Sequence, residues 1–362
     1  MQTNEIQDIY SDYLLSSMSY TTATGLARLV NGAVSHDQVS RFLAGELQTS
    51  AKWWQRVKPL VREIETDRGL LLFDDSIEEK PHTDENAIVC WHFDHSKDRN
   101  IKGINFLSAV YCTDEVSIPV AVQLIAKTES YRDPKSGRVK RRSAKSKNEY
   151  YREMVRACVR NHLRFRYVLN DSWYASVENM NLVKAELQRD FVMALKSNRK
   201  VALSAADKAA GRFQPINTLT PPDGTVCELY LEGIAFPLLF AKQLFTNEDG
   251  STGILYLVTS DLTLNYLTLT TIYQKRWKVE EYHRSLKQNA SLAKSPTKTV
   301  VTQTNHFFAA LYAYVKLEML KVSTNLNHYA IKARLYLAAL QQAFLELQKL
   351  RPISLVAFPD SA

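Results

Sequence analysis

The sequence predicts an α/β fold, in which a mixed sheet is flanked by helices and preceded by an all-helical segment. Leu70–Phe73 and the run that precedes Asp171 are short, continuously apolar stretches of the kind that form buried strands. Strand-like runs also occupy 87–91, 104–112 and 118–126, which indicates that the sheet begins as a meander. Helical stretches lie between the later runs, so strands and helices are expected to share one core.

The composition bounds the class of protein. The chain has 362 residues, of which 45% are hydrophobic and 23% are charged, and this is enough for a main core and one or two smaller units. Its formal net charge of +8 favours a polyanionic partner. Four widely spaced cysteines form no CxxC pair and are expected to be free thiols in a reducing compartment. No apolar run reaches the roughly 20 residues that span a bilayer, and we expect a soluble cytoplasmic protein with no membrane contact.

The N-terminal segment, 1–66, has helical character throughout. Asn31-Gly32 predicts a turn, and Ser35 with Gln38 three residues later predicts a capping box that opens a second short helix. Two short helices about a glycine-bearing turn suggest a helix-turn-helix, with Arg41 among the residues available to contact DNA. A plain helical bundle without a recognition role explains the same pattern equally well.

Acidic residues follow two of the predicted strands. Asp74-Asp75-Ser76 follows the first apolar run, and Asp171-Ser172 follows the second. A buried carboxylate is costly unless it is paired or binds a metal ion, and strands of parallel type can bring their final residues to one edge of a sheet. Adjacent strand residues face opposite ways, so only one of the first two acids should reach the site, and physics does not choose between them. Ser172 is expected to cap a helix over 175–188.

A third acid lies in a charged stretch, Tyr273–Lys287, that contains no proline or glycine and is predicted to form one helix. At about 100° of rotation per residue, Tyr273, Arg276, Glu280 and Lys287 share one face. This face is either a solvated surface with ion pairs or a metal-binding acid among phosphate-binding cations. Arg284, on the same stretch, is counted with the DNA-binding candidates.

The spacing of Tyr273, Arg276, Glu280 and Lys287 resembles the YREK signature of the DDE transposases of bacterial insertion sequences, in the insertion-sequence 4 family and its relatives. The resemblance implies an RNase H-like catalytic core. It also implies two Mg²⁺ or Mn²⁺ ions, a choice that oxygen-only ligands favour. In this family the first catalytic aspartate directly precedes Ser or Thr, which points to Asp75.

The remaining roles follow from the same resemblance. The second catalytic aspartate matches Asp171 and the glutamate matches Glu280, so Asp75, Asp171 and Glu280 are the implied catalytic and metal-binding residues. Tyr273, Arg276 and Lys287 would hold the phosphates of the transposon end.

The stretch between Asp171 and Glu280 is longer than a minimal core of this kind needs, and its surplus has β character. It resembles the β insertion domain of the family. In relatives that cut through a hairpin intermediate, a tryptophan in the insertion stacks on a flipped base. All five tryptophans of this chain lie outside it, which puts that route in doubt. The expected organisation is a helical DNA-binding domain, a core in two parts, the insertion and a C-terminal helical segment (1–66, 67–197, 198–262, 263–325 and 326–362).

A basic run at 135–147 holds seven Lys or Arg in thirteen residues and no acid. Such a run is ordinarily a solvated loop, but beside a candidate phosphodiester site it is at least as well explained as a strip that follows DNA phosphates. Arg141 and Arg142 are therefore expected to bind DNA.

The resemblance implies cut-and-paste transposition, with cleavage at terminal inverted repeats and strand transfer into target DNA. The expected partners are double-stranded DNA and a second copy of the chain in the DNA complex, at the nucleoid of a bacterium. Two alternatives remain open, a catalytically silent DNA-binding regulator and a metal-dependent nuclease without strand transfer.

Overall fold

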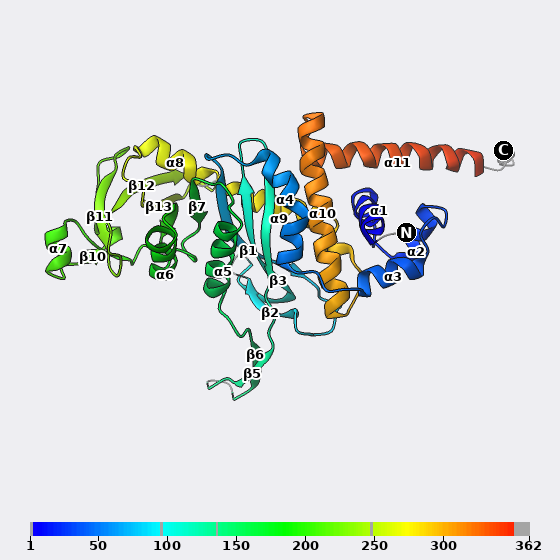
Figure 1. Ribbon diagram of the computed structural model, residues 1–362, viewed down its shortest axis with the longest axis horizontal. Coiled ribbons are helices and arrows are strands. Elements are labelled where there is room, and N and C mark those ends of the chain that lie inside the picture. Colours follow the sequence, from blue (N-terminus) through cyan, green and yellow to red (C-terminus); the bar gives the residue numbers. More distant parts are fainter. Residues whose placement is uncertain (1–2, 95–96, 135–136, 247–248, 351–362) are drawn as a thin grey trace, which may run out of the picture.

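A mixed sheet runs through the long axis of the molecule in the computed structural model, which describes residues 3–94, 97–134, 137–246 and 249–350 (Figure 1). The strands lie in the order β10-β9-β11-β12-β13-β8-β7-β1-β3-β2, and β4 also pairs with β3. Their bounds are β1 Leu70–Glu79, β2 Val89–Asp94, β3 Arg99–Cys112, β4 Ser117–Leu124, β7 Tyr167–Asn170, β8 Asp190–Leu195, β9 Lys200–Ala202, β10 Gln214–Pro215, β11 Cys227–Leu231, β12 Leu238–Thr246 and β13 Thr252–Thr259. The predicted α/β class is confirmed. The expected meander was wrong, because β1 pairs with β3 instead of β2, and β2 and β4 both pair with β3.

The centre of the sheet positions the acidic residues. Strand β1 pairs in parallel with β7, from Leu70 opposite Tyr167 to Phe73 opposite Asn170. On its other side β1 pairs antiparallel with β3 along its whole length. The expectation that the first strand ends at Phe73 was therefore wrong, because β3 supplies ladder partners for six more residues. Asp74 and Asp75 lie in the middle of β1, directly after the end of its parallel pairing with β7.

The β-rich segment 198–262 continues the same sheet. Strand β13 pairs antiparallel with β8, and β8 pairs in parallel with β7, so the ladder is unbroken from the aspartates to the far edge. Only the short strand β9 and the edge strand β10 extend beyond β11. The helical pieces near this part of the chain are short: α6 Val177–Asn181, the π-helix Leu182–Glu186, α7 Ala205–Ala209 and the 3₁₀ turn Ile216–Thr218.

Different helices cover the two faces of the central strands. Helix α5 (Lys147–Arg160) packs on one face, where Tyr151 contacts Phe73 and donates to Asn170. Helices α9 (Trp277–Gln288) and α10 (Val300–Thr324) pack on the other, where His283 and Phe307 contact Phe106. Helix α8 (Tyr266–Gln274) and the 3₁₀ turn Leu292–Lys294 flank α9 in the chain.

The N-terminal residues form helices α1 (Thr3–Ser16), α2 (Ala23–Leu29), α3 (His36–Ala44) and α4 (Ser50–Ile64). The predicted capping box is confirmed, since Ser35 accepts from the Gln38 backbone while the Gln38 side chain accepts from the Ser35 backbone. Helix α4 packs on β4, where the Trp53 indole donates to the Pro119 carbonyl. Helices α1 and α3 contact α10, so these helices share the hydrophobic core of the sheet.

The last helix, α11 (His328–Leu350), extends away from the body (Figure 1). Only its first turns have buried residues, His328 and Ile331, whereas Leu340, Phe344 and Leu347 are each about half exposed. Within the described ranges, no helix has the length and the apolar character needed to cross a membrane.

Candidate active site

Two neighbouring aspartates of β1 point to opposite faces of the sheet. Phe73 and Asn170 are the last parallel partners of β1 and β7, and both contact Tyr151 of α5. Because side chains alternate along a strand, Asp74 points to the other face, where α9 lies. The His283 imidazole of α9 is 4.0 Å from the Asp74 carboxylate, which agrees with this placement. Asp75 points toward α5, where its carboxylate bonds to Lys147.

Asp74 lies in a cluster of like charges. Burial raises its pKa to about 7, the negative charges of Asp171 and Asp75 add to the effect, and Arg276 only partly offsets it. Asp171 directly follows the last residue of β7, one position beyond the pairing of Phe73 with Asn170, so it is level with Asp74. Burial also raises the pKa of Asp171, against the backbone N–H groups of Trp173 and Tyr174 and the charge of Arg276. A cation is what this pair of carboxylates lacks.

Asp75 has the opposite environment. Its carboxylate accepts from the Lys147 ammonium at 2.5 Å, the Tyr174 hydroxyl at 2.6 Å and the Asn105 amide at 3.2 Å. Burial alone would raise the pKa of Asp75, but Lys147 and the two neutral donors outweigh it, and the pKa is lowered. Asp75 is thus a charged carboxylate whose partners are supplied by the protein itself.

Glu280 projects from α9 and is held by Arg276. The Arg276 guanidinium donates to the Glu280 carboxylate at 2.7 Å and lies against the Tyr273 ring, with 5.8 Å to its centroid. Burial opposes the charge of Arg276, but Tyr273, Glu280 and Asp74 outweigh it and raise its pKa. One guanidinium therefore links Glu280 to the Asp74–Asp171 pair. Burial raises the pKa of Tyr273 to about 12, so its hydroxyl stays protonated.

The stretch predicted to be one helix is two. Helix α8 ends at Gln274 and α9 begins at Trp277, and the Lys275 and Arg276 amides donate three residues back instead of four. The sequence signals no break, because nothing between these helices is a poor helix former. The tightened turn keeps Tyr273 and Arg276 adjacent, although they belong to different helices.

The other cations of this stretch lie farther along α9. Lys287 is partly buried and donates to the Ile77 carbonyl of β1 at 2.7 Å. Burial lowers its pKa, although Glu78 nearby favours the charge. Arg284 is exposed on the outer side of α9. Lys287 is therefore held against the sheet, whereas Arg284 is free to reach a ligand.

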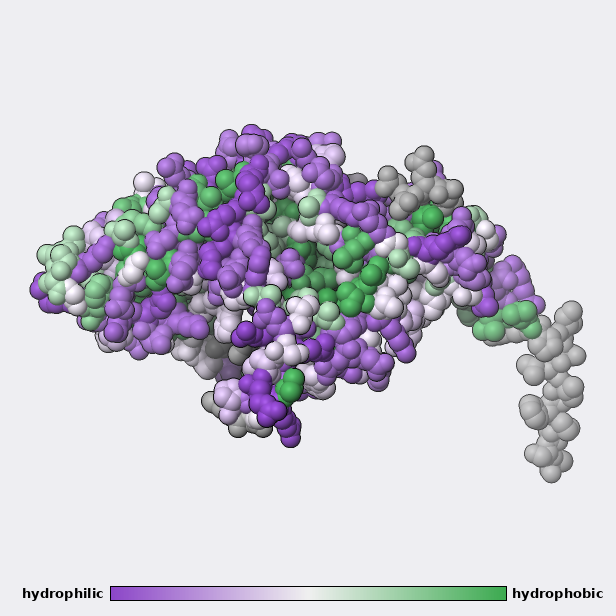
Figure 2. All heavy atoms as spheres, turned by 60° about the horizontal axis from the view of Figure 1, so that its bottom comes forward, coloured by the Kyte–Doolittle hydropathy of each residue, from purple (hydrophilic) through white to green (hydrophobic). Residues whose placement is uncertain are grey.

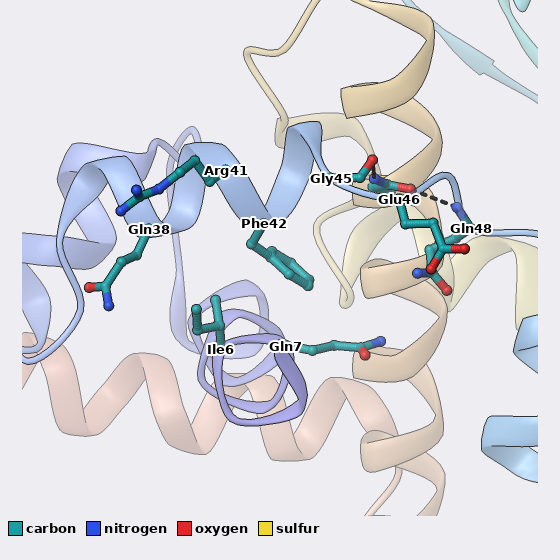
Figure 3. A pocket seen from close by; sticks show the side chains of 9 residues that line it. Ile6, Gln7, Gln38, Arg41, Phe42, Gly45, Glu46 and Gln48 are labelled. Carbon is teal, nitrogen blue, oxygen red and sulfur yellow. Dashed lines mark hydrogen bonds between the residues drawn. The ribbon is translucent and has the colours of Figure 1, made fainter. Parts of the chain in front are cut away.

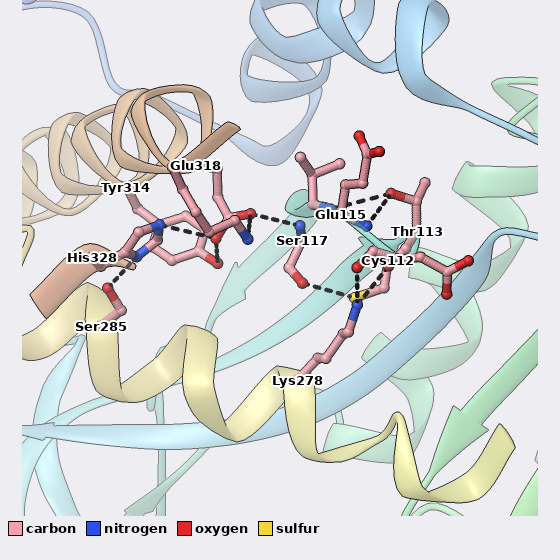
Figure 4. Close-up of polar contacts among 12 residues, drawn as sticks. Cys112, Thr113, Glu115, Ser117, Lys278, Ser285, Tyr314, Glu318 and His328 are labelled. Carbon is pink, nitrogen blue, oxygen red and sulfur yellow. Dashed lines mark hydrogen bonds and ion pairs between the residues drawn. The ribbon is translucent and has the colours of Figure 1, made fainter. Parts of the chain in front are cut away.

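Both ends of α9 are anchored by polar contacts (Figure 4). At its start the Lys278 ammonium donates to the Thr113 carbonyl at 2.6 Å, in the turn after β3. Near its end Ser285 bonds to His328 of α11 at 2.7 Å, and His328 lies 3.1 Å from the buried Glu318 carboxylate of α10. Glu280 thus projects from a helix that is fixed on either side of it.

Arg41 lies at a distance from these carboxylates, on the exposed side of α3. Figure 3 shows Phe42 pointing toward α1, whereas Arg41 lies on the far side of α3. Both residues line a hollow of about 440 Å³ between α1, α3 and α10, together with Gln38 and Asn305. None of the carboxylates Asp74, Asp75, Asp171 and Glu280 lines this hollow, which lies between the N-terminal helices and α10.

Two family models match the sequence. Residues 2–215 match the DDE superfamily endonuclease family, and residues 140–316 match the transposase DDE domain. The chain belongs to the DDE superfamily endonuclease family. In this DDE protein the first match includes Asp74 and Asp75, the second includes Glu280, and both include Asp171. A comparison with curated proteins finds no match. Membership makes the chain an enzyme of nuclease or transposase type with DNA as its substrate.

DDE enzymes typically use divalent metal ions, and the donor set here fits hard cations in its chemistry, since every candidate ligand is a carboxylate oxygen. The catalytic and metal-binding roles of Asp75, Asp171 and Glu280 stay a prediction. Among residues 3–94, 97–134, 137–246 and 249–350, no three His, Cys, Asp or Glu side chains are grouped so as to hold a metal ion. This holds for Asp74 as well as for Asp75, and two of the candidate carboxylates have cationic partners within the protein, Lys147 on Asp75 and Arg276 on Glu280.

The expected helix over 175–188 is confirmed over 177–186, but the expectation that Ser172 caps it was wrong. Asp171 accepts from the backbone N–H of Trp173 at 3.0 Å, which bends the chain into an Asx turn. The helix begins later, at Val177, and Ser176 caps it. Lys147 and Tyr174, which contact Asp75, were not singled out from the sequence. Only the parallel register of β1 and β7 would have indicated that Asp74 is the residue level with Asp171.

Proposed function

We propose that this protein is a transposase that cleaves DNA at the terminal inverted repeats of an insertion sequence and joins the ends to target DNA, with Mg²⁺ or Mn²⁺. The observation that carries the proposal is the partly buried pair Asp74 and Asp171, which lie level just after the parallel pairing of β1 and β7 ends and share the guanidinium of Arg276 with Glu280. Membership in the DDE family supplies the class of reaction.

The first metal-binding aspartate is a choice between neighbours. Asp75 is the residue that precedes serine, as the insertion-sequence family would have it, but three donors of this chain already satisfy it. Asp74 faces α9 and Glu280, and the charge of Asp171 already destabilises its ionised form. We therefore assign the metal to Asp74, Asp171 and Glu280, and give Asp75 the task of fixing Lys147 and Tyr174 beside them.

Two bound ions would activate the attacking hydroxyl and stabilise the leaving oxygen in an in-line displacement at phosphorus. The protein's own residues bind and orient the DNA. Arg276 can grip two phosphate oxygens once it leaves Glu280, and the Tyr273 hydroxyl is beside it to donate a further bond. Arg284 extends the positive surface along α9, and Lys287 would join it as a phosphate-binding cation once it leaves the Ile77 carbonyl.

The remaining parts of the chain have proposed roles of their own. Helices α2 and α3 act as a helix-turn-helix, with Arg41 on the exposed side of α3. The half-exposed apolar residues of α11 form the contact with a second copy in the DNA complex. The segment 198–262 serves as the family's insertion on an RNase H-like core. The protein works in the bacterial cytoplasm, on the nucleoid.

The test is Glu280→Gln on a DNA duplex that carries the inverted repeat of the element encoding the chain. We expect Mg²⁺-dependent nicking to disappear while binding of the duplex stays near the wild-type value, because the cations that bind phosphate are unchanged. Nicking at the wild-type rate would refute the assignment. Joining of the cleaved ends to a plasmid distinguishes a transposase from a nuclease that does not transfer strands, and a silent regulator would bind without nicking.

A further inference from the structure

Strands β5 (Glu129–Arg132) and β6 (Val139–Arg142) form a two-stranded ribbon apart from the central sheet. The ribbon projects from the body beneath the end of β2, and in the space-filling view it stands out as a mostly hydrophilic extension (Figures 1 and 2). All its described residues except Arg141 are exposed. A lone two-stranded hairpin is at best marginally stable in water. Because this ribbon is exposed, it buries little apolar surface, and a contribution to the hydrophobic core does not explain its presence.

The ribbon concentrates the charge of the chain. Between 129 and 147 there are eight Lys or Arg and two acids, so six of the eight net positive charges lie in nineteen residues. Like charges at this density repel one another unless a polyanion neutralises them. The composition therefore indicates a polyanionic partner for this part of the molecule.

The cations at the root of the ribbon are already used. Arg141 donates to the Glu85 carboxylate at 2.7 Å and to the Asn86 carbonyl at 3.1 Å, which ties the ribbon to the loop before β2. Arg142 bonds to Glu129 on the opposite strand at 3.1 Å, and its guanidinium lies over the Tyr131 ring. In this structure, the two arginines expected from the sequence to bind DNA fix the ribbon in place.

Nearer the tip Lys140 bonds to Asp133, whereas Arg132 and Arg138 have no such task. Arg132 lies opposite Val139 in the ladder, and Val139 is 70% exposed. The side chains of Arg132 and Arg138 make no hydrogen bond or ion pair with any residue that the structure describes. An exposed valine beside these two guanidinium groups lacks a packing partner among the residues that the structure describes, but it suits a DNA groove, where thymine offers a methyl group and the walls are phosphates.

We propose that this ribbon enters the major groove of double-stranded DNA next to the phosphodiester at the carboxylates, with Arg132 and Arg138 as its DNA contacts. The proposal rests on the proposed function, which supplies the duplex. A two-stranded ribbon has the width that the major groove admits. The ribbon also leads to the aspartates of β1, because the chain passes from β6 into α5, whose first residue, Lys147, bonds to Asp75, the neighbour of Asp74.

The experiment measures binding without chemistry, in EDTA, to a fluorescent 30-base-pair duplex over a series of salt concentrations. Removing two phosphate contacts should make the slope of log K against log salt shallower by about 1.8, at about 0.9 for each phosphate. We expect this change for the double variant Arg132→Ala and Arg138→Ala. The matched control is Arg68→Ala with Arg160→Ala. It removes two exposed cations, one just before β1 and one at the end of α5 that lies farther along the chain from the ribbon, and it should leave the slope unchanged.

A second duplex identifies the groove, because glucosylated hydroxymethylcytosine fills the major groove with sugar. Wild-type affinity should be at least about tenfold lower for this duplex than for the unmodified one, which is the scale of one lost groove contact. The Arg132/Arg138 variant, which has already lost these contacts, should bind the two duplexes with nearly the same affinity. Equal wild-type affinity for both duplexes, or equal slopes in the ribbon and control variants, would overturn the proposal. Failure of the proposed function is distinguishable, since wild type would then bind as expected but never nick DNA in Mg²⁺.

Discussion

Asp74 and Asp75 are adjacent in sequence and are partly buried to a similar degree in the middle of β1, yet their surroundings are opposite. Asp75 has an ammonium, a hydroxyl and an amide as partners, and its pKa is lowered. Asp74 is beside Asp171, and its pKa is raised to about 7. A carboxylate that has hydrogen-bond donors and a cation as partners contributes to the stability of the fold. A carboxylate that lies beside another negative charge lowers that stability and is available to a ligand. Our proposed assignment of the metal to Asp74, with a structural role for Asp75, rests on this contrast.

The largest expected effect breaks this pair apart. Asp74→Asn should lower the rate of Mg²⁺-dependent nicking by at least about 10³-fold, the scale of losing an essential catalytic group. Asp75→Asn keeps the shape and two neutral partners, and should retain far more activity. Rates measured on one inverted-repeat duplex decide the matter. If Asp75→Asn were inactive and Asp74→Asn active, Asp75 would be the first catalytic aspartate, as its position directly before Ser76 predicts.

Thermal unfolding of the same two variants should rank them in the opposite order, with the stability of the protein lowered by Asp75→Asn and raised by Asp74→Asn. Asp75→Asn should lose about 1–3 kcal/mol of stability, because Lys147 is left without its carboxylate. Asp74→Asn should melt at a higher temperature than wild type in EDTA at pH 8, above the pKa of Asp74, since the charge repelled by Asp171 is gone. Mg²⁺ should raise the melting temperature of wild type but not of Asp74→Asn. Destabilisation by both variants would mean that both carboxylates are structural.

Much of this arrangement could be predicted from the sequence. Continuous apolar runs, a capping box and the spacing from Tyr273 to Lys287 are local signals, and the strands, the cap of α3 and the proximity of Tyr273, Arg276 and Glu280 follow from them. The side to which Asp74 points could not be predicted, because it depends on which strand residues pair. The roles of Lys147 and Tyr174 depend on contacts across 72 and 99 positions, for which no local pattern exists.

Substitution of Arg276 should have a smaller effect, confined to metal binding by the carboxylates on the Asp74 face of the sheet. Its guanidinium holds Glu280 and partly neutralises Asp74 and Asp171, so it competes with a metal ion for the same carboxylates. In the absence of DNA, Arg276→Ala should bind Mn²⁺ about fivefold or more tightly than wild type, the lower end of usual coupling between two ligands. Calorimetric titration measures this directly. The control is Arg284→Ala, an exposed cation of the same helix, and an equal gain in both variants would reduce the effect to overall charge.

Deletion of 1–66 would be a poor test of DNA recognition, because α4 packs on β4 and helices α1 and α3 contact α10. Arg41→Ala is the better change, since Arg41 is exposed on α3 and its loss leaves the core intact. We expect a several-fold weaker preference for the inverted repeat over random DNA, with nicking of bound DNA unchanged. An unaltered preference would favour a helical bundle with no recognition role.

The smallest expected effect concerns the anchor of the helix that presents Glu280. Ser285→Ala removes the hydrogen bond to His328 at 2.7 Å and the one from Asn289 at 3.1 Å, and should cost about 1 kcal/mol in urea unfolding. Ser323→Ala is the control, because its hydroxyl makes only an exposed bond to the Leu320 carbonyl. Nicking should fall less than in any carboxylate variant, because Lys278 still fixes the start of α9. A loss as large as that of Asp74→Asn would mean that the position of α11 controls Glu280, which would make the Asp74 side of the sheet a conformational switch as well as a metal site.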